Sequence, residues 1–191
     1  MVRGTVHGLP KYPHEAAAIL ALAYLAGLAS DGEVSYGVRL VSRSTDLYGG
    51  TDAHWVVVYP DGKPFVRLDF TTGKEELVEK KKTRTEEKSK KTGRRKVEIL
   101  DFPPAIFTTL GAFPCFPPAY RVLTAGAKRG RKIWGVWEGD ILSTTSPCPE
   151  HGNGCPFCEE LLTLGRWLHY KLPPWAKIPR DRREGKLRGR P

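Results

Sequence analysis

Four residues in the last third of the chain have the side chains and the spacing of a metal site. Cys148 and His151 form one pair with two residues between them, and Cys155 and Cys158 form a second pair with the same spacing. Three thiolates and one imidazole suit a tetrahedral Zn²⁺ ion, and four protein ligands leave no open position for a catalytic water. The glycines between the two pairs let the chain turn tightly around an ion. The pattern therefore predicts a structural zinc site.

The remaining cysteine, Cys115, leaves an iron–sulfur cluster open as the alternative cofactor. Such a cluster normally takes four thiolates, so Cys115 would replace His151 as the fourth ligand. The N-terminal segment has no signal-peptide pattern, and the longest apolar run, residues 16–29, is too short to span a bilayer. We therefore expect a cytoplasmic protein without a membrane segment, in which clustered cysteines bind metal rather than form disulfides.

The positive charge of the chain is concentrated in two segments. Of the net charge of +10, residues 74–96 contribute +6 and residues 171–191 contribute another +6, whereas the rest of the chain carries −2. Lys and Arg gathered in such segments are typical of proteins that contact nucleic-acid phosphates. The alternative interpretation is that both segments are solvated and serve solubility alone.

We interpret the two segments, together with a basic turn at residues 128–132, as a DNA- or RNA-binding surface of weak sequence preference. The predicted nucleic-acid-binding residues are Lys80, Lys81, Lys82, Arg84, Arg94, Arg95, Lys96, Lys128, Arg129, Arg131, Lys132, Arg180, Arg182, Arg183, Arg188 and Arg190. The same charges would also attract an acidic protein partner or a larger nucleoprotein assembly.

Four tryptophans lie in the same half of the chain as the basic turn, namely Trp134, Trp137, Trp167 and Trp175. Exposed rings beside basic residues suit single-stranded nucleic acid, whose bases stack on them. The other interpretation is that these rings belong to the core, because a buried tryptophan removes a large apolar area from water.

The first half of the chain predicts a helix followed by strands. Residues 14–29 are rich in Ala and Leu on every side, which predicts a buried helix. Residues 34–42, 54–59 and 65–70 are predicted strands, and the Pro-Asp-Gly-Lys turn between the last two predicts a hairpin. Residues 74–91 have so little apolar surface that they predict either a charged helix or disorder, and we expect a segment that is mobile or that becomes ordered on binding.

In the second half, residues 97–100, 120–124 and 132–137 are predicted strands, and residues 159–170 are a predicted helix with leucines on its apolar side. The expected fold class is α+β, with an N-terminal buried helix, a mainly antiparallel sheet, and a C-terminal zinc knuckle and helix. The expected divisions are a helix and sheet core at 1–73, a charged mobile insertion at 74–96, further strands of that core at 97–147, the zinc knuckle and helix at 148–170, and a basic tail at 171–191.

Residues 22–34, which read LAYLAGLASDGEV, resemble the LAGLIDADG motif of homing endonucleases. This resemblance implies a helix that packs against its twin and a DNA-facing sheet. It also implies that Asp31 would bind a divalent metal that cleaves DNA. Because the chain has one such motif, an endonuclease of this kind would be a homodimer.

Residues 12–70 resemble the histidine and aspartate part of transglutaminase-like and papain-like hydrolases instead. In that family an Asp orients a His that activates a Cys, and His54 and Asp69 would take the first two roles here. The start of the preceding helix carries His14 and no cysteine. This second resemblance therefore implies a catalytically inactive relative that acts as an interaction module.

We expect a basic, zinc-containing, nucleic-acid-binding protein that is a non-catalytic component of a nucleoprotein. The alternatives are a LAGLIDADG-type endonuclease or its inactive relative, and the inactive papain-like protein. If the protein is an enzyme at all, we expect a divalent-metal-dependent endonuclease. The single methionine, the 16 prolines and the 27% of charged residues are typical of proteins from thermophiles.

Overall fold

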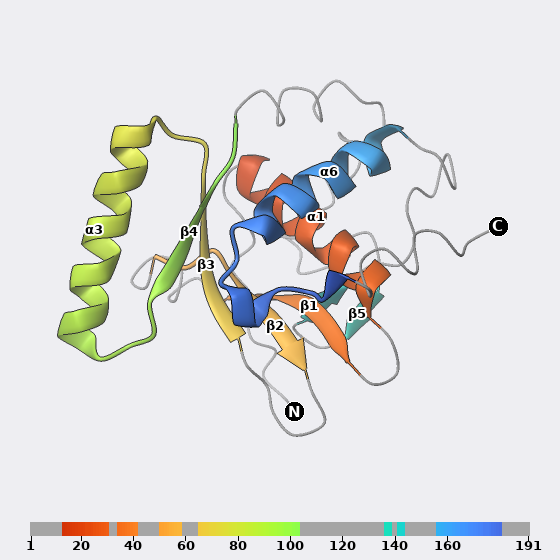
Figure 1. Ribbon diagram of the computed structural model, residues 1–191, viewed down its shortest axis with the longest axis horizontal. Coiled ribbons are helices and arrows are strands. Elements are labelled where there is room, and N and C mark those ends of the chain that lie inside the picture. Colours follow the sequence, from red (N-terminus) through yellow and green to blue (C-terminus); the bar gives the residue numbers. More distant parts are fainter. Residues whose placement is uncertain are drawn as a thin grey trace, which may run out of the picture.

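The computed structural model describes residues 13–30, 34–41, 50–58, 65–103, 136–138, 141–143 and 156–180. Within them lie α1 (Pro13–Ala29), β1 (Ser35–Leu40), β2 (Ala53–Val58), β3 (Phe65–Thr71), α3 (Glu75–Thr92), β4 (Val97–Asp101), β5 (Val136–Glu138), β6 (Ile141–Ser143), α6 (Pro156–Tyr170) and the 3-10 turn η1 (Pro174–Ala176). Helices α1 and α6 cross each other beside the sheet, and α3 stands apart, next to β4 (Figure 1). No helix in this described part is long and apolar enough to cross a bilayer.

The strands form one mixed sheet in the order β4-β3-β2-β1-β6-β5. All neighbouring pairs are antiparallel except β3 and β4, which run parallel. The predicted α+β class and the mainly antiparallel sheet are therefore confirmed. The hairpin between β2 and β3 is also confirmed, with Ala53 opposite Leu68. Strand β6 could not be predicted, because its three residues are too few to show a period.

Helix α1 is buried on every side, as its composition predicts. All of its described side chains from Ala17 to Ala26 are at most 8% exposed. The helix ends where Ser30 donates a hydrogen bond from its hydroxyl to the Ala26 carbonyl at 2.8 Å and accepts one from the backbone N–H of Tyr36 at 2.9 Å. That pair of bonds connects the end of α1 directly to the start of β1.

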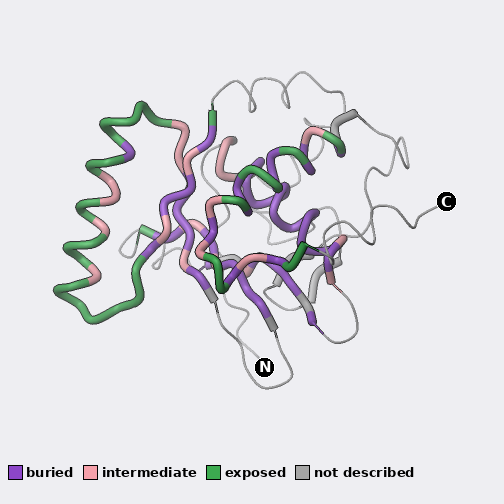
Figure 2. The backbone as a smooth tube through the Cα atoms, viewed as in Figure 1, coloured by how far each residue is buried: buried purple, intermediate pink, exposed green. Residues whose placement is uncertain are grey.

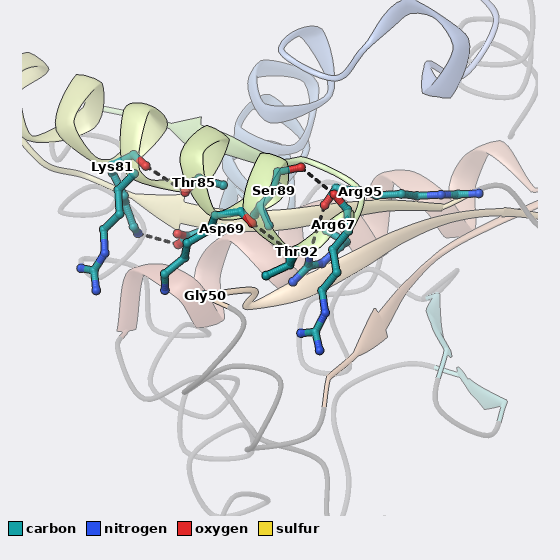
Figure 3. A pocket seen from close by; sticks show the side chains of 12 residues that line it. Gly50, Arg67, Asp69, Lys81, Thr85, Ser89, Thr92 and Arg95 are labelled. Atoms are coloured by element: carbon teal, nitrogen blue, oxygen red, sulfur yellow. Dashed lines mark hydrogen bonds and ion pairs between the residues drawn. The ribbon is translucent and has the colours of Figure 1, made fainter.

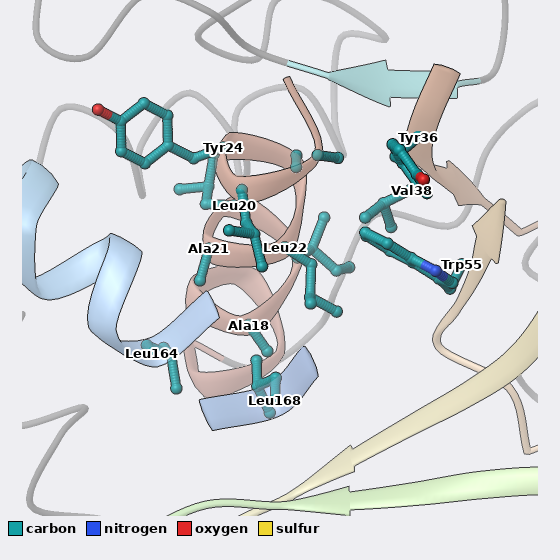
Figure 4. Close-up of a cluster of buried hydrophobic side chains, with 14 of the residues drawn as sticks. Ala18, Leu20, Ala21, Leu22, Tyr24, Tyr36, Val38, Trp55, Leu164 and Leu168 are labelled. Atoms are coloured by element: carbon teal, nitrogen blue, oxygen red, sulfur yellow. The ribbon is translucent and has the colours of Figure 1, made fainter. Parts of the chain in front are cut away.

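The main core lies between α1, α6 and one face of the sheet. Alternate residues of β1 and β2, including Val38 and Trp55, point towards α1, while Leu164 and Leu168 reach it from α6 (Figure 4). The predicted apolar side of α6 is confirmed, since its four leucines are at most 4% exposed. Exposed residues concentrate on α3 and on the outer side of α6 (Figure 2).

Gly165 sets the distance between the two crossing helices. A Cβ built at this position would lie 2.6 Å from the carbonyl oxygen of Ala21 and 3.3 Å from the Cβ of Leu25. The first contact is with backbone and is closer than carbon and oxygen can approach, so α6 can sit this near α1 only without a side chain there.

Helix α3 is the crossover that joins the parallel strands β3 and β4, because parallel neighbours cannot be linked by a tight turn. Of the two alternatives predicted for this segment, the helical one is present. Glu75 and Glu76 occupy its first turn, Lys90 and Lys91 its last, and Gly93 ends it with a φ of 64°. These are favourable positions for the helix dipole and the C-cap. The apolar surface of this helix is small, but it packs on the sheet, since Val78 is buried against two residues of β4. The expectation of a mobile segment did not take this contact into account.

The expected basic tail starts later than residue 171. The indole N–H of Trp55 donates a hydrogen bond to the carbonyl of Ala176 at 2.9 Å, and the backbone N–H of Ile178 donates one to Nε2 of His169 at 2.6 Å. Leu172, Ala176 and Ile178 are at most 2% exposed. Residues 171–178 are therefore held against Trp55 and the end of α6, with Leu172, Ala176 and Ile178 in the core.

The contact at Gly165 can be tested by adding one methyl group. Overpacking of this kind lowers the free energy of unfolding by about 1–3 kcal/mol, against a gain in helix propensity of about 1 kcal/mol. We expect Gly165→Ala to unfold at lower urea concentration than the parent chain. Arg166→Ala, at the exposed neighbouring position, is the control and should change the midpoint little. Equal midpoints for the parent and Gly165→Ala would contradict the close approach.

Candidate nucleic-acid interface

A groove of about 330 Å³ lies between α3 and the sheet, on the side opposite the main core, and we call it the basic groove. Its lining comes from α3, β3, the start of β4 and the turn between α3 and β4 (Figure 3). Among the described residues, six cationic side chains line it, together with one carboxylate, that of Asp69. The cations are Arg67, Lys81, Arg84, Lys88, Arg94 and Arg95.

Two of these cations have structural partners. Arg67 donates hydrogen bonds to the carbonyl of Arg95 at 3.0 Å and to the hydroxyl of Thr51 at 2.8 Å. Lys81 forms an ion pair with Asp69, with 2.5 Å between Nζ and Oδ1. These contacts attach α3 and the turn after it to β3, and they hold the two sides of the groove in place.

Three other cations remain available to a ligand. The side chains of Arg84, Lys88 and Arg94 are exposed and form no ion pair or hydrogen bond with any residue the structure describes. The pKa of Arg67 is lowered, first by burial and then by repulsion from Arg94. Cations held this close to one another repel, and an anion between them would relieve the repulsion.

The hydroxyl groups in the groove serve the helix rather than a ligand. Thr85 and Thr92 each donate to the backbone carbonyl four residues earlier at 2.8 Å, and Ser89 donates to the carbonyl of Arg94 at 2.5 Å. Their protons are therefore engaged, and the donors that an anion would meet are the ammonium and guanidinium groups. Arginine is well suited to this role, because its planar fork matches two phosphate oxygens at once.

Asp69, which lines the groove and is buried, forms a carboxylate pair with the half-buried Asp52. Asp52 accepts a hydrogen bond at Oδ2 from the backbone N–H of Phe70 at 2.6 Å, and its side chain is hydrogen-bonded to that of Asp69. Burial, followed by repulsion from Asp69 and Glu15, raises the pKa of Asp52 to about 9. At neutral pH Asp52 is thus protonated, and Lys81 forms its ion pair with Asp69. No other described carboxylate lines the groove, so its remaining cations have no acidic neighbour among the lining residues.

The structure brings together four of the predicted nucleic-acid-binding residues, Lys81, Arg84, Arg94 and Arg95. It separates others from them. Lys82 forms an ion pair with Glu79 at 2.6 Å, Lys96 forms one with Glu86 at 3.0 Å, and Lys80 is exposed without lining the groove. Arg180 is exposed beyond the core segment 171–178. Outside the described residues lie Lys128, Arg129, Arg131, Lys132, Arg182, Arg183, Arg188 and Arg190.

Sequence reasoning missed two residues of the basic groove, Arg67 and Lys88. Lys88 lies in the charged run and is four positions after Arg84, which puts both on one side of a helix. Arg67 stands between the apolar Val66 and Leu68, whose alternation places it on the opposite face of β3. Both patterns are present in the sequence. Arg67 and Lys88 become neighbours, however, only when α3 packs beside the sheet face that carries Arg67.

Only Cys158 of the four predicted zinc ligands lies in the described part of the chain; Cys148, His151 and Cys155 lie outside it, as do Cys115 and Asp31. Cys158 is buried in the first turn of α6, which begins three residues earlier than the predicted start of that helix. Among the described residues no three His, Cys, Asp or Glu side chains are grouped to hold a metal. The zinc site therefore remains a prediction.

The pair expected from the papain-like resemblance lies on one face of the sheet. His54 is opposite Arg67 in the register of β2 and β3, and Asp69 is two residues further along β3, so all three side chains share that face. The carboxylate of Asp69 is engaged with Lys81 and Asp52. His14, at the start of α1, has its pKa lowered by burial and then by Lys81.

No protein-family model matches the chain, and no curated protein or solved structure matches it either. The charges and contacts of the residues themselves therefore have to indicate the function.

The protonated state of Asp52 predicts a particular pH dependence of stability. Its pKa is about 9 in the folded chain against 3.8 as the ordinary value, so the folded state holds one more proton than the unfolded state between these pH values. The contribution of Asp52 to the free energy of unfolding is therefore fully present below pH 4 and is lost as pH rises towards 9.

The variant Asp52→Asn tests this pH dependence. An Asn side chain resembles the protonated acid, can accept the hydrogen bond from the backbone N–H of Phe70, and does not titrate. We expect Asp52→Asn to exceed the parent in melting temperature at pH 8 by more than at pH 5. A pH-independent difference between the two would contradict the assignment.

Proposed function

We propose that the protein binds nucleic acid through its phosphate backbone, and that the basic groove is the principal contact. The observation that carries the proposal is the convergence of Arg84, Lys88 and Arg94 on one groove without any acidic partner in the described structure. Such an arrangement raises self-repulsion in the unbound protein, and a polyanion with regularly spaced phosphates relieves it.

The extended shape of the groove fits a polymeric anion better than a small metabolite. The three available cations are exposed along an 18-residue helix and its following turn, which is an extended site rather than an enclosed one. Base-specific contacts need side chains placed against base edges, whereas these cations are suited to phosphate. The proposal is therefore binding with weak sequence preference, to DNA or RNA, as part of a nucleoprotein and without a catalytic step.

The groove can be tested with two double variants of the same helix. Arg84→Gln with Lys88→Gln removes two charges that face the groove, whereas Lys80→Gln with Lys90→Gln removes two exposed charges that do not line it. Glutamine has nearly the same helix propensity, so both variants should keep α3. We expect the groove variant to reduce the slope of log K against log salt by about 1–2, with little change in the control.

The measurement is fluorescence anisotropy of a labelled oligonucleotide at several salt concentrations. Equal losses of affinity in the groove variant and in the control would mean that total charge matters and the groove does not. Absence of binding by the parent chain would overturn the proposed function altogether.

A structural zinc ion at Cys148, His151, Cys155 and Cys158 is part of the same proposal. The donor set suits Zn²⁺, and the place of Cys158 in the first turn of α6 fits it, because a helix N-terminus stabilises a thiolate. Such an ion would join the segment before α6 to the helix that packs on α1. We also propose a cytoplasmic location, because reducing conditions there keep the cysteine thiols available to bind zinc.

Elemental analysis of protein purified without added metal tests the zinc proposal. We expect one zinc per chain, a large loss of bound zinc in Cys155→Ser, and no loss in Cys115→Ser. Iron with visible absorption, lost in Cys115→Ser, would establish the iron–sulfur alternative instead. A chain with neither metal would contradict both.

A further inference from the structure

Three large aromatic side chains are exposed within a nine-residue stretch at the end of α6 and in η1. Trp167 is 45% exposed, Tyr170 77% and Trp175 58%, and we call these three the aromatic surface. Large rings normally contribute to the core, as Trp55 does here with no exposure. Of the two interpretations of Trp167 and Trp175, the exposed one is therefore correct. The side chains of Trp134 and Trp137 lie outside what the structure describes.

Cations accompany two of these rings. Nζ of Lys171 lies 5.4 Å from the ring centroid of Trp167, and Nζ of Lys177 lies 4.8 Å from that of Tyr170. Lys171 is also held by the carboxylate and the carbonyl of Asp101, each at 2.7 Å. Each ammonium approaches one face of its ring, and a planar ring has two faces. The surface thus combines flat apolar area with fixed positive charge.

The aromatic surface is attached to the rigid core. Helix α6 packs against α1 at Gly165, and the segment after it is fixed by the hydrogen bonds of Trp55 with Ala176 and of His169 with Ile178. The indole N–H of Trp167 donates to the carbonyl of Asp101 at 3.3 Å. Rings held in place before binding lose little conformational entropy when a ligand stacks on them.

We propose that the aromatic surface stacks the bases of single-stranded nucleic acid, so that the protein prefers single strands to duplexes. This inference rests on the proposed function, and it names the form of nucleic acid that the protein binds. Bases in a duplex already stack on each other and hide their faces, whereas bases in a single strand can stack on an exposed ring. The nearby lysines attract the phosphates that link those bases.

A lipid surface is the other partner that exposed tryptophans and lysines could meet. Binding to lipid draws on a broad apolar face that includes aliphatic residues. Among the described residues the one exposed large aliphatic side chain is Leu77, which lies on α3 rather than beside the rings. The composition of the aromatic surface therefore favours stacking of bases over insertion into lipid.

The experiment compares the full chain with Tyr170→Leu/Trp175→Leu in binding a labelled single strand and a duplex of the same sequence. Both side chains are more than half exposed, so the variant should fold, as circular dichroism can verify. We expect the parent to prefer the single strand, and the variant to lose roughly tenfold or more of its single-strand affinity. Duplex affinity should stay unchanged, because it depends on the basic groove.

The matched control is Leu77→Ala, which removes an equally exposed apolar side chain that is not aromatic. It should leave both affinities unchanged. Equal losses on single strand and duplex, or no loss at all, would overturn the stacking inference while leaving the proposed function in place. Failure of the parent to bind either nucleic acid would overturn both. Ring-dependent binding to vesicles of anionic phospholipid, without a single-strand preference, would establish the lipid surface instead.

Discussion

The close contact between α1 and α6 at Gly165 determines how the core is assembled. Helix α1 is apolar on every side, so it is stable only when the sheet covers one side and α6 another. The 2.6 Å approach of a hypothetical Cβ to the Ala21 carbonyl shows how little room there is between the two helices. Once α6 is seated, the segment that follows it reaches Trp55 and closes the core.

In the described part of the chain, cationic side chains gather at two places outside this core. Helix α3 packs on the opposite face of the sheet and brings its cations against β3, and the end of α6 presents lysines beside exposed rings. Asp52 is protonated at neutral pH, because its pKa is raised to about 9, so it adds no negative charge beside Asp69. The folded structure therefore holds cations together, although their mutual repulsion opposes this arrangement, which is a feature typical of sites that bind polyanions.

The hydrophobic pattern was enough to predict α1, β4 and α6, and the β2–β3 hairpin needed the Pro-Asp-Gly-Lys turn as well. Helix α3 could not be distinguished from disorder, since the contacts that hold it are non-local. Val78 meets residues of β4, and Lys81 meets Asp69 twelve positions earlier. The same reason hid Arg67 and the carboxylate pair, whose partners are close only in the folded chain. Whether Trp167 and Trp175 are buried or exposed could not be predicted for a different reason. Composition does not tell which side of a helix or turn faces solvent.

The proposed binding of nucleic acid through cations gathered by the fold can be measured as the salt dependence of binding of the full chain to a labelled single-stranded oligonucleotide. With three available cations in the groove, we expect log K to fall linearly with log salt with a slope of about −2 or steeper. A slope near zero, or no binding at the lowest salt concentration, would contradict it.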